Sequence, residues 1–229
     1  MQPSKTERPA ASEVSLGLTS GLEERANYLS HGVGALCSLL GVAVLLKQAA
    51  ERSTLTLLAC SVYGLTLVLM FASSTAYHAV PAAHERAKRA LRTLDHCAIF
   101  LLIAGTYTAL SLAVPHSTAA SALLAGVWLL SALGIAALAR RGGRRRQGGP
   151  IVFYLALGAL VALALPALRG PLGKDGVLLL SSGGIIYTLG VPFYVARRLR
   201  FHHMIWHVFV LCASALHFLV VLRYVVVRG

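Results

Sequence analysis

Hydrophobic residues fill most of this chain in long runs that short polar segments separate. Single runs extend from about 26 to 46, between Arg52 and Glu85, from about 150 to 168, from 177 to 196 and from 203 to 227. The segment from His96 to Ala139 contains no Asp, Glu, Lys or Arg, and its length allows two crossings of about 20 residues each. The pattern therefore predicts an all-α membrane protein with seven transmembrane helices.

The polar segments between these runs are short. Pro115–Thr118 and residues 169–175 have the composition of turns, and residues 140–149 form a basic, glycine-rich loop. We therefore expect two parts, a polar N-terminal tail over residues 1–25 and one seven-helix domain over residues 26–229. Because no long soluble insertion interrupts the runs, a functional site must be built by the helices themselves.

Composition and charge agree with a membrane protein. Hydrophobic residues make up 57% of the chain and charged residues 13%, whereas soluble domains are about 25% charged. The net charge of +13 would indicate nucleic-acid binding in a soluble protein, but here the basic residues lie between apolar runs. Fifteen of the 21 Lys and Arg residues fall in the tail and in the second, fourth and sixth connections. The positive-inside rule then predicts a protein of the cell membrane with a cytoplasmic N-terminus and an external C-terminus.

The four cysteines lie far apart, each inside an apolar run, and none forms a CxxC pair. They are Cys37, Cys60, Cys97 and Cys212. This placement predicts small buried hydrophobic residues, and it argues against a disulfide framework or a thiolate metal site.

A few ionisable residues stand inside or at the ends of the runs, where they are costly and often functional. His78 ends the second run, Asp95 begins the third, and His203 and His207 begin the seventh. The two histidines of the seventh run are four residues apart, so their rings share one helix face. Ser74 and His78 have the same spacing. The predicted topology places all of these side chains in the cytoplasmic half of the bilayer.

Three neutral imidazoles suit zinc, and three protein ligands with a fourth position open to water are typical of a catalytic site. We therefore predict zinc ligands at His78, His203 and His207. Asp95 would act on the water or orient a ligand ring, and Ser74 would donate a hydrogen bond to a carbonyl oxygen or to Asp95. Taken alone, Asp95 also fits an N-cap, and a single histidine at a helix end also fits an interfacial position.

The remaining histidines fit structural positions better. His202 is rotated by about 100° from the face of the pair, so we expect it at the membrane interface. His217 lies deeper and is expected to be packed and hydrogen-bonded. His84, His96 and His116 are expected in loops or at helix ends.

Four motifs together resemble those of a known family. They are Glu24-x-x-Asn27-x-x-x-His31, Ser74-x-x-x-His78, Leu94-Asp95 and His203-x-x-x-His207. With them, nearly the whole chain beyond the tail resembles the hemolysin III group of the progestin and adipoQ receptor (PAQR) superfamily, in its compact bacterial form. The resemblance implies a seven-helix fold with the N-terminus inside. It also implies zinc held at His78, His203 and His207, with Asp95 and Ser74 close by.

Three functions follow as expectations. The first is a zinc-dependent hydrolase of a lipid amide or ester, similar to the alkaline ceramidases, with Asp95 as general base and membrane lipids as partners. The second is the pore-forming, cytolytic activity for which the bacterial members are named. The outer halves of the predicted spans hold almost no ionisable residues, which disfavours a pore through a single chain. The third is a receptor or membrane sensor in which zinc is structural.

Overall fold

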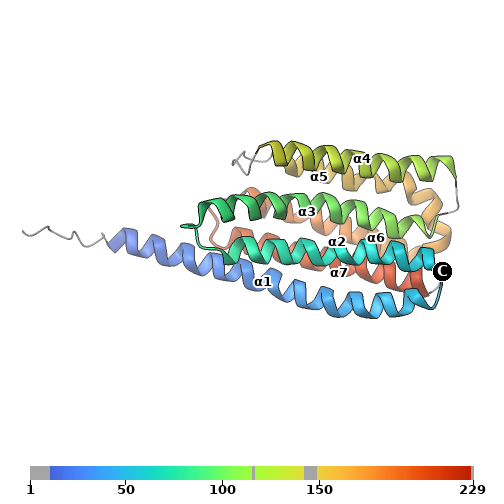
Figure 1. Ribbon diagram of the computed structural model, residues 1–229, viewed down its shortest axis with the longest axis horizontal. Helices are drawn as coiled ribbons and strands as arrows, with labels where there is room; N and C mark the ends of the chain where they lie inside the picture. The colour runs from blue at the N-terminus through green and yellow to red at the C-terminus, as the bar shows by residue number, and fades with distance from the viewer. Residues whose placement is uncertain (1–10, 115–116, 142–148, 228–229) are drawn as a thin grey trace, which may run out of the picture.

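The computed structural model of this chain describes the backbone of residues 11–114, 117–141 and 149–227, and the side chains of these stretches from Gly21 on, except Gly149. The described residues are almost entirely helical and contain no strand. The elements are α1 (Ala11–Ala50), α2 (Thr54–Ala79), α3 (Glu85–Ser111), α4 (Thr118–Arg140), α5 (Gly149–Ala159), α6 (Val161–Val195), α7 (His202–Val220) and a π-helical segment, η1 (Val221–Val227). Figure 1 shows them side by side along one axis, with α1 extending beyond the others at its N-terminal end.

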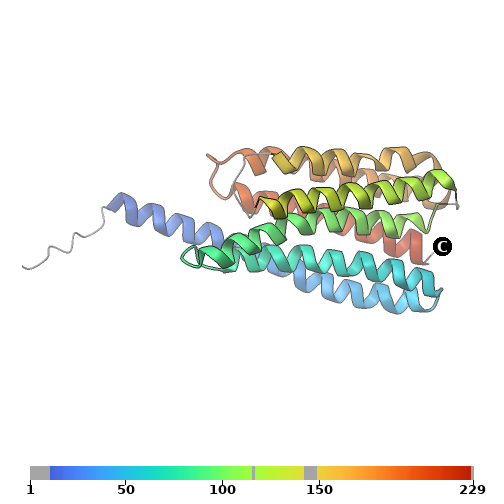
Figure 2. The same ribbon diagram turned by 45° about the horizontal axis from the view of Figure 1, so that its top comes forward.

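Six helical stretches of the described chain are long and apolar enough to cross a membrane, one fewer than the sequence predicts. The difference lies in Pro150–Val195, a stretch of 46 residues that would measure about 70 Å as one straight helix. Inside it, Gly173 has the non-helical angles φ 63° and ψ −176°. Figure 2 shows this gold-to-orange stretch running to one end of the bundle and returning. The turn predicted at residues 169–175 therefore coincides with a break in the helix.

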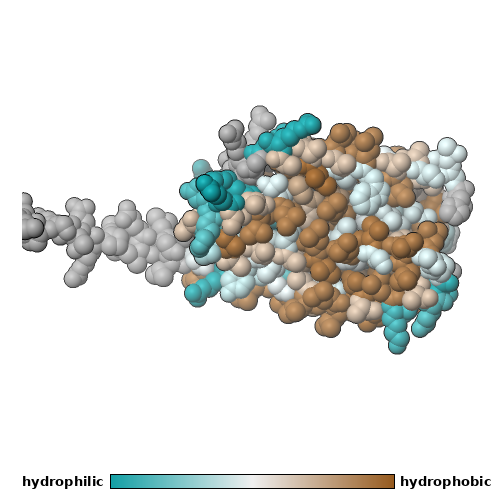
Figure 3. All heavy atoms as spheres, viewed as in Figure 1, coloured by the Kyte–Doolittle hydropathy of each residue, from teal (hydrophilic) through white to brown (hydrophobic). Residues whose placement is uncertain are grey.

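The exposed surface between the two ends of the bundle is apolar. Leu40, Leu65 and Leu163 are each about 70% exposed, and Figure 3 shows a broad hydrophobic belt with hydrophilic side chains gathered at both ends. In water such a belt would be unfavourable, whereas lipid tails solvate it. The described surface thus has the character of a membrane-embedded bundle.

One end of the bundle gathers the basic connections. There α2 ends, α3 begins, α4 ends and α6 passes into α7 (Figure 1). The end carries Arg86, Lys88, Arg89, Arg140, Arg141, Arg197, Arg198 and Arg200, and we call it the basic end. The C-terminus lies at the opposite end.

Two apolar clusters hold the bundle together, and α3 contributes to both. The larger joins α1, α2, α3, α6, α7 and η1 around residues such as Tyr63, Leu67 and Val210. The smaller joins α3 to α4 and α5 around Phe100, Val127 and Tyr154. Helix α3 is therefore the element that connects the two halves.

Glycine allows two helices to approach α2 closely. A Cβ atom at Gly105 of α3 would lie 2.2 Å from Thr66 Oγ1, and one at Gly34 of α1 would lie 2.5 Å from Phe71 Cδ1. Since no side chain larger than hydrogen fits at these points, the backbones pack as small-residue interfaces do in membranes. The contact at Gly34 lies one helical turn from His31, so it also sets the position of α1 near the histidines described below.

The prediction that all four cysteines are buried needs correction. Cys60 and Cys97 are buried as predicted, but Cys37 and Cys212 are exposed. These two lie on helix faces that point outward, and in a membrane an outward position is as apolar as the core.

Candidate metal centre

His78, His203 and His207 form a compact cluster at the basic end. His78 comes from the last turn of α2, and His203 and His207 come from the first two turns of α7. One nitrogen of each ring lies within 4.8 Å of one nitrogen of each of the others. The ring centroids are 4.6 to 5.1 Å apart. The structure thus brings together the three residues that the sequence predicts as ligands.

Two of these rings are oriented by α1. His78 Nδ1 lies 2.7 Å from Glu24 Oε2, and His207 Nδ1 lies 3.2 Å from the carbonyl oxygen of Asn27. Because a carboxylate and a carbonyl oxygen accept hydrogen bonds, both rings carry their proton on Nδ1 and direct the lone pair of Nε2 elsewhere. Carboxylate and carbonyl partners of this kind are typical of metal-binding histidines.

The donor set fits a metal ion. His78 Nε2 is buried and has no hydrogen-bond partner among the described residues, and a buried polar atom left in that state is costly. A tetrahedral zinc ion with zinc–nitrogen bonds of about 2.0–2.1 Å holds two ligand nitrogens about 3.3–3.4 Å apart. The three nitrogens lie within 4.8 Å of one another, so an inward rotation of the rings would bring them to one ion. Three imidazoles suit zinc, copper, iron or nickel rather than magnesium or calcium.

A fourth histidine packs against this cluster. His31 of α1 stacks on His207, with ring centroids 3.5 Å apart and planes inclined by 21°, and it makes a T-shaped contact with Phe71, with centroids 5.2 Å apart. Within the described chain, neither ring nitrogen of His31 has a hydrogen-bond partner, although the residue is only 3% exposed. His31 therefore supports the His207 ring and leaves donor capacity toward the neighbouring cavity.

The roles of Glu24, Asn27 and His31 were not assigned from the sequence. The three residues are spaced three and four apart, which places them on one face of α1. That periodicity is a signal that a polar face exists, but it does not say which other helices the face meets.

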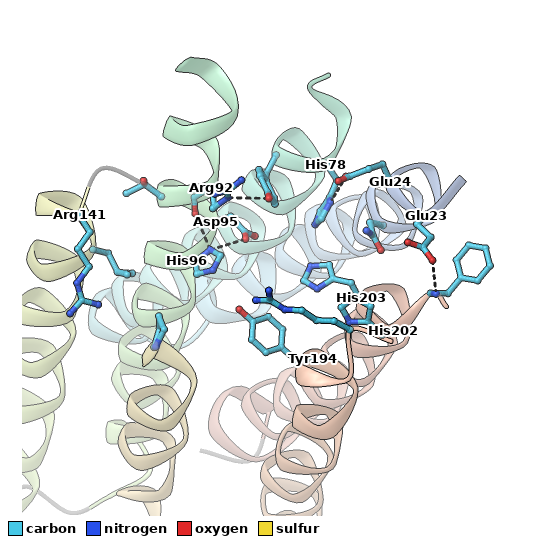
Figure 4. A pocket seen from close by; sticks show the side chains of 17 residues that line it. Glu23, Glu24, His78, Arg92, Asp95, His96, Arg141, Tyr194, His202 and His203 are labelled. Carbon is cyan, nitrogen blue, oxygen red and sulfur yellow. Dashed lines mark hydrogen bonds and ion pairs between the residues drawn. The ribbon is translucent and has the colours of Figure 1, made fainter. Parts of the chain in front are cut away.

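Helix α7 is anchored where it begins. Phe201 precedes the helix in a left-handed conformation, with φ 57°, which is unfavourable for a residue that has a Cβ atom. Its backbone N–H donates a hydrogen bond to Glu23 Oε1 of α1, over 3.1 Å. Figure 4 shows this contact at the edge of the pocket. Glu23 thus positions the turn from which His203 projects.

Asp95 and Ser74 lie beside the cluster rather than in it. Asp95 Oδ2 is 3.2 Å from Nδ1 of His96 on the same helix. Figure 4 shows His78 and His203 close together, with Asp95 and His96 across the pocket from them. Ser74 is buried one helical turn before His78. Both residues line the apolar cavity described next.

Two cavities meet at the cluster. A polar pocket of about 360 Å³ opens at the basic end and is lined by Glu23, Glu24, Asn27 and three arginines, Arg92, Arg141 and Arg197. A larger cavity of about 510 Å³, which we call the apolar chamber, extends between α3, α5, α6 and α7. Both are lined by Asp95, His96, Tyr194 and His203. Volumes in this range are typical of small-ligand sites.

The other histidines lie outside the three-histidine cluster. His202 Nδ1 donates to the carbonyl oxygen of Phe193, and His217 Nε2 donates to that of Leu180, so neither belongs to the cluster. His84 precedes α3 as expected, and His116 lies outside the described residues. His96 lies within α3, paired with Asp95, rather than in a loop.

Comparison with known proteins relates most of the chain to one group. The profile of a family described as "Haemolysin-III related" matches residues 20–218. "Hemolysin-3" of Bacillus cereus is 37% identical over 204 residues, which cover 89% of this chain and 92% of the relative. A "Hemolysin-3 homolog" of Bacillus subtilis is 38% identical over 89% of this chain and 95% of its own length. Human "Monocyte to macrophage differentiation factor" is 29% identical over 88% of this chain and 84% of its own length.

Proposed function

This chain belongs to the haemolysin-III related family and is a multi-pass protein of the cell membrane, and from this membership and its three-histidine cluster we propose a zinc-dependent hydrolase of membrane lipids. The bond cleaved is an amide or an ester. The observation that carries the proposal is the position of the cluster, where a polar pocket and an apolar chamber meet. A lipid presents the same combination, a polar head joined by a hydrolysable bond to an apolar chain.

We further propose seven membrane crossings with the N-terminus in the cytoplasm. The 46-residue stretch Pro150–Val195 is more than twice the length needed to span a hydrocarbon core of about 30 Å. Two crossings that reverse at Gly173 account for its length. The basic end then faces the cytoplasm, as the positive-inside rule requires, and so does the metal centre.

Zinc is the proposed metal because its preferred ligands are those of the cluster. His78, His203 and His207 would hold it, while Glu24 and the Asn27 carbonyl oxygen keep the protons on the Nδ1 atoms of His78 and His207. When bound, zinc polarises a carbonyl group and makes water acidic enough to react near neutral pH.

The remaining steps fall to residues of the chain. Asp95 accepts a proton from the water as the water's oxygen attacks the carbonyl carbon, and it returns the proton to the leaving amine or alcohol. Ser74 donates a hydrogen bond to the carbonyl oxygen. The lipid head group lies in the polar pocket and the acyl chain in the chamber, so that the scissile bond lies beside His203 and Asp95, which line both.

Replacing Asp95 separates catalysis from metal binding. Asp95→Asn keeps the size of the side chain but removes the base, so the release of fatty acid should fall by about 10²–10⁴-fold while the zinc content stays at the level of the wild type. The measurement is fatty-acid release from ceramides, other N-acyl amides and esters by purified protein in nanodiscs, with zinc determined by elemental analysis.

Two results would contradict this assignment. Zinc-loaded wild type that releases no fatty acid from any lipid of the panel would refute the hydrolase. Release that is unchanged in Asp95→Asn would keep the hydrolase and remove Asp95 as its base.

A cytolytic function is the second candidate, and the printed name of the Bacillus cereus relative, "Hemolysin-3", favours it. The test is the release of a trapped dye from vesicles that contain the purified protein. Release by wild type that persists in Asp95→Asn would support cytolysis without hydrolysis.

A further inference from the structure

The apolar chamber extends far from the three-histidine cluster toward the opposite end of the bundle. Its lining on α3 runs from Asp95 to Leu110, and on α7 it runs from His203 to His217. At 1.5 Å of rise per residue, the α3 lining spans about 22 Å and the part of α7 beyond His207 spans about 15 Å. The chamber is therefore a long cavity with the candidate metal centre at one end.

His217 and Leu180 lie together at the far end. In the part of α6 that follows the break at Gly173, Leu180 is the lining residue most distant in sequence from Tyr194, and His217 holds the corresponding position on α7. His217 Nε2 donates a hydrogen bond to the Leu180 carbonyl oxygen over 3.1 Å. The ring also packs so closely on Gly183 that a Cβ atom there would lie 2.4 Å from it. These contacts hold the His217 ring in one position at the far end of the chamber.

A second polar pair, Tyr187 and Ser214, lies beside the His217 ring. Tyr187 packs against the His217 ring, with centroids 5.6 Å apart, and its hydroxyl is hydrogen-bonded to Ser214 Oγ over 2.7 Å. The polar groups at this end thus bond one another or the backbone, which leaves an apolar cavity above them suited to a hydrocarbon chain.

We propose that the apolar chamber selects acyl chains by length and that His217 and Leu180 form the floor that sets the limit. The proposal rests on the proposed function in that it takes the acyl chain of a membrane lipid as the occupant of the chamber. An extended covalent chain advances about 1.2 Å per bond, so a depth of about 15–22 Å corresponds to roughly 12 to 18 carbon atoms. Up to that limit, each further buried methylene should strengthen binding about fourfold. Beyond that limit, additional methylene groups should not increase the affinity further.

Gly158 of α5 offers a way to shorten the chamber. It lines the chamber about 10 Å from Ile151 along the helix, and a Cβ atom on it would meet none of the described atoms within 4 Å. Gly158→Leu therefore places a side chain in open space and should fold. Gly126 of α4 also has open space around its Cβ position but is not among the lining residues of the chamber, so Gly126→Leu is a matched control.

The experiment measures binding of saturated fatty acids, from octanoic to eicosanoic acid, to the full-length protein in detergent micelles by native mass spectrometry. In wild type, affinity should rise with chain length and then level off. Gly158→Leu should move this limit to shorter chains and His217→Ala to longer ones, while Gly126→Leu leaves it in place. If His217→Ala does not fold, the comparison of Gly158→Leu with Gly126→Leu still tests whether the chamber limits chain length.

Two outcomes would overturn the proposal. One is affinity that rises through eicosanoic acid without levelling in wild type, and the other is a limit that is the same in wild type and Gly158→Leu. Because binding of free fatty acids needs no hydrolysis, a limit that moves as expected supports the chamber even if the lipid panel shows no turnover. Turnover without such a limit would retain the hydrolase and refute the floor.

Discussion

The His78 ring is oriented by a residue of another helix. The Glu24 carboxylate accepts the Nδ1 proton over 2.7 Å, and Lys88 Nζ lies 3.6 Å from the same carboxylate oxygen. In the neutral ring, this arrangement leaves Nε2 as the nitrogen with a free lone pair, which is the atom that can bind a metal. Glu24 is therefore a positioning residue of the candidate site.

Glu24→Gln should weaken zinc binding by about 10–100-fold, the usual effect of losing a carboxylate behind a ligand histidine. Competition with a zinc chelator measures the change. Glu85→Gln is the control, because Glu85 carries the same charge at the same end but pairs with exposed Arg89 and not with a histidine of the cluster. Equal zinc affinity in Glu24→Gln and wild type would mean that the carboxylate does not support the site.

Of the adjacent histidines at the start of α7, His203 is a proposed ligand and His202 is not. His203→Ala and His207→Ala each remove one of the three proposed ligands and should release most of the zinc. His202→Ala should retain it, because His202 Nδ1 bonds the Phe193 carbonyl oxygen instead. Elemental analysis of the three purified variants tests this. Zinc at the wild-type level in both His203→Ala and His207→Ala would refute the centre.

At the scale of elements, helix α1 packs closely against α2 and α7. A Cβ atom at Gly34 would lie 2.5 Å from Phe71 Cδ1 and 2.8 Å from Leu211 Cδ2. Phe71 in turn packs against His31, which stacks on His207. Through these contacts, the spacing of the three helices affects the position of the three-histidine cluster.

Gly34→Ala should destabilise the protein by about 1–3 kcal/mol through overpacking, and it should lower zinc retention by displacing Phe71. Gly32→Ala provides the comparison, because its Cβ atom would meet Thr75 at an ordinary 3.7 Å and alanine favours helix over glycine. Thermal unfolding in detergent should show a lower midpoint for Gly34→Ala alone. Identical midpoints for the two variants would show that the contact of Gly34 with Phe71 and Leu211 has room for a Cβ atom.

At the scale of the whole molecule, the basic end and the C-terminus lie at opposite ends of the bundle (Figure 1). Fifteen of the 21 basic residues of the sequence belong to the tail and to the second, fourth and sixth connections. Lys and Arg resist translocation, so we expect this asymmetry to determine how the bundle inserts.

A C-terminal fusion to a reporter that works only in the cytoplasm should be silent in cells, and a fusion after residue 145, in the connection between α4 and α5, should be active. Whole-cell fluorescence or enzyme activity reads out both. A bright C-terminal fusion would contradict seven crossings or their orientation.

Much of this architecture is encoded locally and could be predicted. Runs of about 20 apolar residues specify spans because each span satisfies its own backbone hydrogen bonds. The spacing of His203 and His207 and of Ser74 and His78 places each pair on one helix face, since the geometry of a helix is the same in any surroundings.

The contacts between helices became visible only in the tertiary structure, because they depend on which helix faces meet. The sequence by itself determined that His203 and His207 share one face of α7 and that a histidine ends α2. It did not determine that Glu24 and Asn27 of α1 orient these rings, or that His31 stacks on His207. Nor did it reveal the chamber that ends at His217. Contacts between helices, and the cavities between them, depend on the packing of all side chains together. A glycine such as Gly34 allows two helices to approach closely, and the sequence around it does not predict which helix will do so.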